Sequence, residues 1–169
     1  MRILVTGASG FIGQSLVPAL AKRGFSVRAA ARDPVRITQA PNIEPIAMPD
    51  LAYPANWSAA LDDVSHVVHL AGIAHAPGRL PDDDYARINT EAVAELAGQA
   101  KGRIERFVLM SSVRAQAGLS SPTTITEMEP PAPTEIYGRT KLEAERRLAA
   151  SGVDFTVLRP AVVYGPGVK

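Results

Sequence analysis

Residues 2–13 read RILVTGASGFIG and decide the fold, because a short apolar run is followed at once by three regularly spaced glycines. Residues 2–6 are rich in branched side chains, which is typical of a strand buried on both faces. Residues 11–23 place apolar side chains at helical spacing, and Gly24 ends that helix. Pro18 lies inside the helix, where it removes one hydrogen bond and favours a kink.

The same alternation of strand and helix continues along the chain. Further strands are predicted at 25–31, 43–48, 66–71, 106–111 and 154–159. Further helices are predicted at 56–61, 82–100 and 135–150. Irregular segments are predicted at 32–42 and at the proline-rich 117–134. Strands that alternate with helices favour a parallel sheet covered on both faces and wound by right-handed crossovers. The predicted fold class is therefore α/β, with a doubly wound parallel sheet in three α/β/α layers.

Length and composition exclude several classes of protein. A chain of 169 residues fits one domain with a proper core. The balance of 18 Lys+Arg against 17 Asp+Glu excludes the basic footprint of a nucleic-acid or membrane-surface protein. The absence of cysteine from the sequence excludes disulfides, thiolate catalysis and zinc–thiolate sites. No apolar run approaches the roughly 20 residues that span a bilayer, and the glycine-rich start is unlike a signal peptide, so a cytoplasmic location is expected.

Gly7, Gly10 and Gly13 form a G-x-x-G-x-x-G loop between the first strand and the first helix. Glycines there permit a tight turn with positive φ and let the backbone approach a pyrophosphate closely. The start of the helix directs free N–H groups and its positive dipole end at the phosphates. Three glycines alone are a weak signal, but their place between an N-terminal strand and an amphipathic helix predicts a Rossmann-type dinucleotide site.

The end of the second strand bears on the choice between NAD and NADP. An acidic residue there would bind the ribose hydroxyls of NAD, but the strand ends Ala30-Ala31-Arg32. An arginine can pair with the 2′-phosphate, so Arg32 favours NADP. Asp33 follows directly and weakens that argument, and Arg32 is equally compatible with a solvated loop. Asp50, after the third strand, is either a partner for the adenine amino group or an ordinary turn residue.

Tyr137 and Lys141 stand four residues apart in a predicted helix, so both lie on one face. A lysine ammonium near a phenol favours the phenolate and lowers the tyrosine pKa from about 10 towards the operating pH, as a general acid/base requires. Ser112 ends the fifth strand, where sites gather in such sheets. The tyrosine–lysine spacing alone fits a half-buried tyrosine beside a solvated lysine equally well, but the ordered set of glycine loop, serine, tyrosine and lysine is specific.

This ordered set resembles the extended short-chain dehydrogenase/reductase family, the NAD(P)-dependent epimerases, dehydratases and reductases. Further segments that carry the resemblance are residues 69–72 (HLAG), Asn89 in YARINTEAV, Ser111-Ser112 and residues 159–167 (RPAVVYGPG). Within the family, SSVRAQ and YGRTK look most like bacterial UDP-glucose 4-epimerase-like proteins. The resemblance covers nearly all of the chain.

The resemblance implies that Ser112, Tyr137 and Lys141 form the catalytic triad, with Lys141 also holding the nicotinamide ribose and Ser111 as the alternative serine. It also implies a homodimer through the helices at 82–100 and 135–150. Asn89 and the segment 160–163 are also compatible with purely structural roles, as a polar residue near a helix start and as a turn. The complete candidate set for the cofactor is Gly7, Gly10, Phe11, Ile12, Gly13, Arg32, Asp50, Leu51, Leu70, Ala71, Gly72, Asn89, Tyr137, Lys141, Pro160, Val162 and Val163.

The chain departs from its family in two places. Members that dehydrate a sugar usually carry acidic residues directly after the strand-five serine or threonine, whereas Val113 and Arg114 stand here, which disfavours a dehydratase. Similar proteins also continue past the RPxxVYGPG segment into a part that holds the substrate. We therefore expect residues 1–169 to be a dinucleotide-binding domain without the C-terminal substrate domain, with the sixth strand at an exposed edge.

Three functional hypotheses remain open. In a sugar-nucleotide epimerase, Tyr137 exchanges a proton with the substrate oxygen while hydride passes between the substrate carbon and the nicotinamide. An NADP-dependent carbonyl reductase uses the same steps and releases its product. A non-catalytic dinucleotide-binding or redox-sensing module belongs to a different class. We expect no metal site, because His66 and His69 lie on opposite faces of a strand; His75 and Arg79 face substrate or only water.

Overall fold

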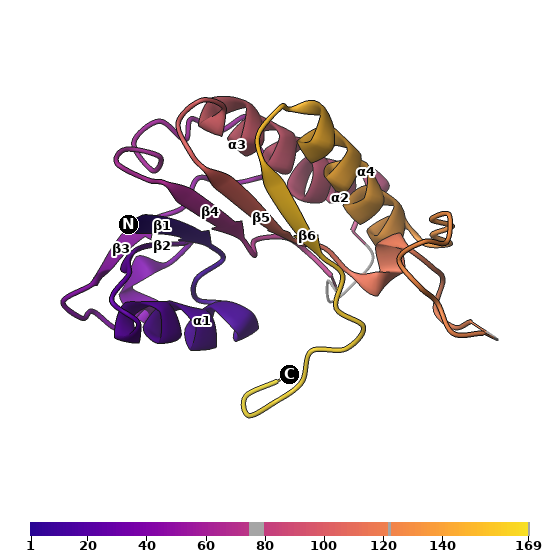
Figure 1. The fold of residues 1–169 in the computed structure, drawn as a ribbon, viewed down its shortest axis with the longest axis horizontal. Coiled ribbons are helices and arrows are strands. Elements are labelled where there is room, and N and C mark those ends of the chain that lie inside the picture. Colours follow the sequence, from indigo (N-terminus) through magenta and orange to yellow (C-terminus); the bar gives the residue numbers. More distant parts are fainter. Residues whose placement is uncertain (75–79, 122, 169) are drawn as a thin grey trace.

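The structure is a computed structural model that describes residues 1–74, 80–121 and 123–168. Its centre is one parallel sheet in the order β3-β2-β1-β4-β5-β6 (Figure 1). The strands are β1 Arg2–Thr6, β2 Ser26–Ala31, β3 Ile43–Ala47, β4 His66–His69, β5 Arg106–Met110 and β6 Phe155–Leu158. The order runs outward from β1 in both directions, which is the Rossmann arrangement, and the crevice where it reverses lies between β1 and β4.

Helices cover both faces of this sheet, as Figure 1 shows. The α-helices are α1 Phe11–Lys22, α2 Asp82–Ala86, α3 Ala92–Ala100 and α4 Ile136–Ala150. Helix α1 lies on one face, whereas α2, α3 and α4 lie on the other. The predicted three-layer, doubly wound fold is confirmed.

Strand β1 shows why these residues form a central strand. Side chains alternate across a strand, so Leu4 enters the core beneath α3 and α4, while Ile3 and Val5 enter the core beneath α1. Leu4 and Val5 are fully buried. Because both faces are covered, the strand reads as a continuous apolar run in the sequence.

The predicted helix at 56–61 is wrong, because residues 56–57 have no regular structure and residues 58–61 form turns. Arg28, buried on β2, donates through Nη1 to the carbonyls of Ala59 at 3.1 Å, Ala60 at 3.2 Å and Asp62 at 2.7 Å. These carbonyls bond to a guanidinium from a distant strand instead of to the amides of a continuing helix. The competing partner lies about thirty residues earlier in the chain, beyond the reach of a local pattern.

The other predicted elements need smaller changes. The helix predicted at 82–100 is interrupted by a π-helical turn, η2 Arg87–Glu91, between α2 and α3. Short 3₁₀ turns occupy η1 Pro34–Arg36 and η3 Val113–Ala115. Helix α1 continues through Pro18 to Lys22. The described part of 117–134 contains no helix or strand, as expected from its prolines. No helix in the described ranges has the length and apolarity to cross a membrane.

Candidate dinucleotide and catalytic site

The glycine loop joins β1 to α1 with no room for larger side chains. Gly7 has φ of +68°, and a Cβ added there would lie 2.8 Å from the backbone nitrogen of Ala71. A Cβ added at Gly13 would lie 2.5 Å from the carbonyl oxygen of Ala8, which explains the close approach of helix to loop. Both positions therefore require glycine.

The first turn of α1 is prepared for a negatively charged group. Gly10 is the N-cap, so the helix begins without a side-chain cap, and its first turn contains no acidic residue. Free N–H groups and the positive end of a helix dipole favour an anion at this place. The geometry fits the pyrophosphate of a dinucleotide.

A cavity of about 750 Å³ opens between the start of α1 and the carboxyl ends of β4 and β5. This volume is in the range of cofactor and ligand sites. The predicted site residues that line it are Ile12, Leu70, Gly72, Ser112, Tyr137, Lys141, Pro160, Val162 and Val163. The fold thus gathers into one cavity residues that lie up to 151 positions apart in the sequence.

The residues predicted for the adenosine end lie on neighbouring strands. Arg32 directly follows β2 and is exposed, and Asp33 uses its carboxylate to accept from the amide of Val35 at 3.2 Å. Asp50 accepts from the amide of Ala52 at 3.0 Å and so forms a turn after β3. The next residue along the chain, Leu51, is buried. The structure places these residues beyond the carboxyl ends of β2 and β3, on the glycine-loop side of the sheet.

Asn89 makes contacts that the sequence did not predict. Its side chain accepts from the amide of Ile73 at 2.9 Å and donates to the carbonyl of Ile73 at 2.9 Å. A Cβ added at Gly72 would lie 2.9 Å from the Asn89 side-chain oxygen. Asn89 therefore holds the loop that follows β4, and it shapes the cavity through that loop.

Ser112, Tyr137 and Lys141 come together at one end of the cavity. Ser112 follows β5, its oxygen accepts from the amide of Arg114 at 3.2 Å, and it lines the same cavity as Tyr137. Tyr137 lies in the first turn of α4, and Lys141 follows one turn later and is buried. Ser111, the alternative serine, donates instead to the buried carboxylate of Glu145. The geometry thus favours Ser112 as the serine of the triad.

The charge balance around Tyr137 differs from the prediction. Burial raises the pKa of Tyr137, while the neighbouring Ser112 hydroxyl and the positive charge of Arg114 oppose that rise. Burial lowers the pKa of Lys141 to about 8, and the Glu145 carboxylate opposes that change. The predicted lowering of the Tyr137 pKa by Lys141 is wrong for this geometry, because desolvation of the phenol dominates.

Sequence reasoning missed a partly buried polar network beside Tyr137 and Lys141. The Glu145 carboxylate accepts from Arg159 Nε at 3.0 and 3.2 Å and also binds the Arg159 Nη2 group. Arg159 in turn donates to the side chain of Gln116. The available signal is the spacing of Tyr137, Lys141 and Glu145 at every fourth position, which puts all three on one face of α4. His75 and Arg79 lie outside the described residues.

Comparison with known sequences identifies the family of the chain. Residues 3–169 match the sequence pattern of the NAD dependent epimerase/dehydratase family. The chain belongs to this family. Within the NAD-dependent epimerases and dehydratases it is similar to proteins with different reactions, so membership identifies the cofactor class and the fold more closely than the substrate.

Two relatives and one solved structure illustrate that range. UDP-glucose 4-epimerase of Vibrio cholerae is 32% identical over 99% of this chain and 53% of its own length. The 3 beta-hydroxysteroid dehydrogenase/Delta 5-->4-isomerase of Mycobacterium tuberculosis is 32% identical over 98% of this chain and 48% of its own length. MoeE5 in complex with UDP-glucuronic acid and NAD superimposes with a TM-score of 0.84 at 34% identity, over 100% of this chain and 57% of MoeE5. The chain therefore spans about half the length of these three proteins.

Proposed function

We propose that this chain binds a nicotinamide dinucleotide across the β1/β4 crevice and carries the acid/base groups of a sugar-nucleotide epimerase or a related oxidoreductase. The observation that carries the proposal is the single cavity lined by Ser112, Tyr137 and Lys141 and by Ile12 from the glycine-loop end of α1. The similarity to UDP-glucose 4-epimerase and to MoeE5, whose structure contains NAD and a UDP-sugar, supports a nucleotide-sugar substrate.

The residues present fit a dinucleotide, and each has a defined task. The uncapped start of α1 and the glycine loop bind the pyrophosphate. Lys141 holds the nicotinamide ribose, and Asp50 and Leu51 border the adenine. When bound, the nicotinamide accepts hydride from a substrate carbon or returns it.

Tyr137 moves the proton that accompanies hydride transfer. Because burial raises its pKa, the phenol carries its proton at neutral pH and can donate it to a substrate carbonyl oxygen. In the opposite direction a substrate hydroxyl gives its proton to the phenolate, which Arg114 stabilises by its charge. Ser112 hydrogen bonds to the same substrate oxygen and orients it towards Tyr137.

An NADP-dependent carbonyl reductase is the second candidate, and Arg32 is the observation that favours it. The exposed guanidinium follows β2, where a 2′-phosphate would meet it. The structural neighbour MoeE5 binds NAD, which favours the epimerase reading. The preserved set of Ser112, Tyr137 and Lys141 argues against a purely non-catalytic redox-sensing module.

We also propose a homodimer through the outer surface of α2, α3 and α4, which lie together on one face of the sheet (Figure 1). Light scattering of the purified chain measures this directly. A mass near 36 kDa would support the dimer, being twice 17.9 kDa, and a mass of 17.9 kDa would contradict it.

Titration with NADH and NADPH, followed by nicotinamide fluorescence at fixed salt, tests the cofactor. Tighter binding of NADPH supports the reductase, and tighter binding of NADH supports the epimerase. If neither nucleotide binds, the dinucleotide proposal fails.

The Tyr137→Phe variant tests the chemistry. We expect it to bind NADH as the unmodified protein does and to lose turnover of UDP-glucose or UDP-glucuronic acid by about 10²- to 10⁴-fold, because it retains the ring and loses the proton donor. Undiminished turnover by Tyr137→Phe would remove the tyrosine from the mechanism.

A further inference from the structure

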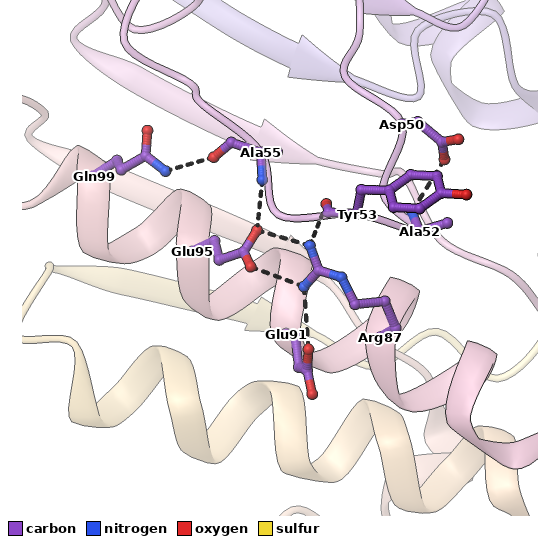
Figure 2. Close-up of polar contacts among 8 residues, drawn as sticks. All are labelled: Asp50, Ala52, Tyr53, Ala55, Arg87, Glu91, Glu95 and Gln99. Carbon is purple, nitrogen blue, oxygen red and sulfur yellow. Dashed lines mark hydrogen bonds and ion pairs between the residues drawn. The ribbon is translucent and has the colours of Figure 1, made fainter.

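A second polar network lies away from the cavity, on the π-helical turn η2 between α2 and α3 (Figure 2). The Arg87 guanidinium forms a bidentate ion pair with the Glu95 carboxylate, with Nη1 2.9 Å from Oε1 and Nη2 3.0 Å from Oε2. It pairs with Glu91 at 3.3 Å and donates to the backbone carbonyl of Tyr53. The Arg87 side chain is only 15% exposed, so these partners fix its position.

Helix α3 holds the same loop through two more side chains. Glu95 accepts from the amide of Ala55 at 3.1 Å. Gln99 accepts from the amide of Trp57 at 2.7 Å and donates to the carbonyl of Ala55 at 2.8 Å. Figure 2 shows that these side chains reach the backbone at Tyr53 and Ala55. Together with the Trp57 contact they hold one strip of backbone, residues 53–57. We call Arg87, Glu95 and Gln99 the loop clamp.

The clamped strip continues directly from Asp50 and Leu51. Asp50 forms a turn with the amide of Ala52, next to Tyr53, so the position of the turn depends on where the strip is held. Trp57 is fully buried in the core beneath α3 and anchors the far end of the strip. Arg87 holds the other end at Tyr53, which is the residue of the strip closest to Asp50 in the chain.

The π-helical turn also forms hydrogen bonds with two other parts of the site, the loop after β4 and helix α4. Asn89 holds both backbone groups of Ile73, as described above, and Thr90 donates to the carbonyl of Thr140 at 2.8 Å. Thr140 precedes Lys141. One five-residue turn therefore binds the loop after β3, the loop after β4 and the start of α4. π-Helical turns are frequent at functional sites because they re-aim side chains that a regular helix would direct elsewhere.

We infer that Arg87 is a positioning residue for the adenine end of the dinucleotide, because it fixes the loop that carries Asp50 and Leu51. This inference rests on the proposed function, since it assumes that these two residues border the adenine. Arg87 itself touches neither Asp50 nor a reacting group in the contacts described; it acts through the Tyr53 carbonyl. Removing it leaves the near end of the strip without its fixed donor.

Calorimetric titration with ADP-ribose, which has the adenine end and lacks the nicotinamide, tests the inference. We expect Arg87→Met to bind ADP-ribose and NADH about tenfold more weakly each. Glu95→Gln, which keeps an acceptor for Ala55 and loses the charge that holds Arg87, should weaken both in the same direction. Because Glu95→Gln is nearly isosteric, it serves if Arg87→Met does not fold.

Two further variants make the comparison specific. Arg147→Met removes an exposed ion pair with Glu143 on α4, at 3.0 Å, and should leave ADP-ribose affinity unchanged. Lys141→Met should weaken NADH binding and leave the affinity for ADP within about twofold, because ADP lacks the nicotinamide ribose that Lys141 is proposed to hold. The inference is supported if Arg87→Met binds both ADP-ribose and NADH more weakly and Arg147→Met does not.

The outcomes separate this inference from the proposed function. If the unmodified chain binds neither ADP-ribose nor NADH, the proposed cofactor site fails and the inference fails with it. If the unmodified chain binds both and Arg87→Met and Glu95→Gln bind ADP-ribose equally well, only the inference fails. A lower melting temperature with unchanged affinity would show that Arg87 is merely structural.

Discussion

His69 is a titratable side chain enclosed at the carboxyl end of β4. One ring nitrogen shares a hydrogen bond of 2.9 Å with the Thr6 hydroxyl, and within the described residues the other nitrogen has no hydrogen-bond partner. Burial, and then the charge of Lys141, lower the pKa of His69 to about 3. The imidazole is therefore neutral at neutral pH, and it is unable to accept a proton without losing stability.

This burial predicts acid sensitivity. The unfolded chain binds a proton at His69 with the ordinary pKa of 6.5, and the folded chain does so only near 3, so the free energy of unfolding falls as the pH drops from 6.5 towards 3. Between pH 7.5 and pH 5, protonation of His69 in the unfolded chain lowers the free energy of unfolding by about 2 kcal/mol. Urea denaturation at both pH values should show this loss in the unmodified chain.

The matched variants are His69→Gln and His66→Gln, at opposite ends of the same strand. His69→Gln should show a shallower dependence on pH, because it has no imidazole to protonate. His66→Gln, which removes a half-buried ring and leaves His69 in place, should retain the part of the pH dependence that His69 causes. Equal slopes for His69→Gln and the unmodified chain would assign the acid sensitivity to other groups.

At the scale of elements, the ion pair of Glu145 and Arg159 joins α4 to the segment after β6. Glu145 is buried, and it also accepts from Ser111 at the end of β5. The Arg159 side chain is 25% exposed and that of Glu145 8% exposed, so removing one partner should cost about 3 kcal/mol, the lower end of the range for buried pairs. The pair therefore holds α4, β5 and the segment after β6 in one arrangement around the cavity.

Glu145→Gln is expected to lower the free energy of unfolding by about 3 kcal/mol. The double variant Glu145→Gln with Arg159→Met should lose less than the sum of the single variants, because no charge is left behind. Glu143→Gln, which breaks the exposed pair with Arg147, should lose less than about 1 kcal/mol. Chemical denaturation of the four variants decides this, and additive losses would show that Glu145 and Arg159 do not act as a pair.

At the scale of the whole molecule, the sheet joins two apolar cores, one beneath α1 and one beneath α3 and α4. The proposed dinucleotide would contact the elements on both sides, from the α1 start to Lys141. A ligand that binds only the folded state stabilises it by mass action, by about 2.7 kcal/mol at a concentration of 100 times Kd. The cofactor should therefore stabilise both cores together.

NADH at that concentration should raise the melting temperature by about 5–10 °C. The fluorescence of Trp57, the single tryptophan of the sequence and part of the core beneath α3, reports the transition. Lys141→Met should show a smaller shift at the same NADH concentration, because its affinity is lower. No shift in the unmodified chain at saturating NADH would contradict binding to the folded state.

The sequence by itself determined the features that depend on neighbouring residues. The run of residues 2–13 specifies β1, the glycine turn and α1, because buried strands, positive φ and helical spacing are local properties. The alternation of strands and helices then leaves the parallel Rossmann sheet as the consistent topology. The strand-end position of Ser112 and the four-residue spacing of Tyr137 and Lys141 are local in the same sense, and the structure brings all three together.

Tertiary structure decided what depends on residues far apart in the chain. The predicted helix at 56–61 does not form, because Arg28 donates hydrogen bonds to the carbonyls of Ala59, Ala60 and Asp62. Burial raises the pKa of Tyr137, opposite to the expected effect of Lys141, and the packing of α4 makes Glu145 an internal partner of Arg159. Desolvation and hydrogen-bond competition are set by the whole surroundings of a group, and those surroundings exist only once distant segments have packed together.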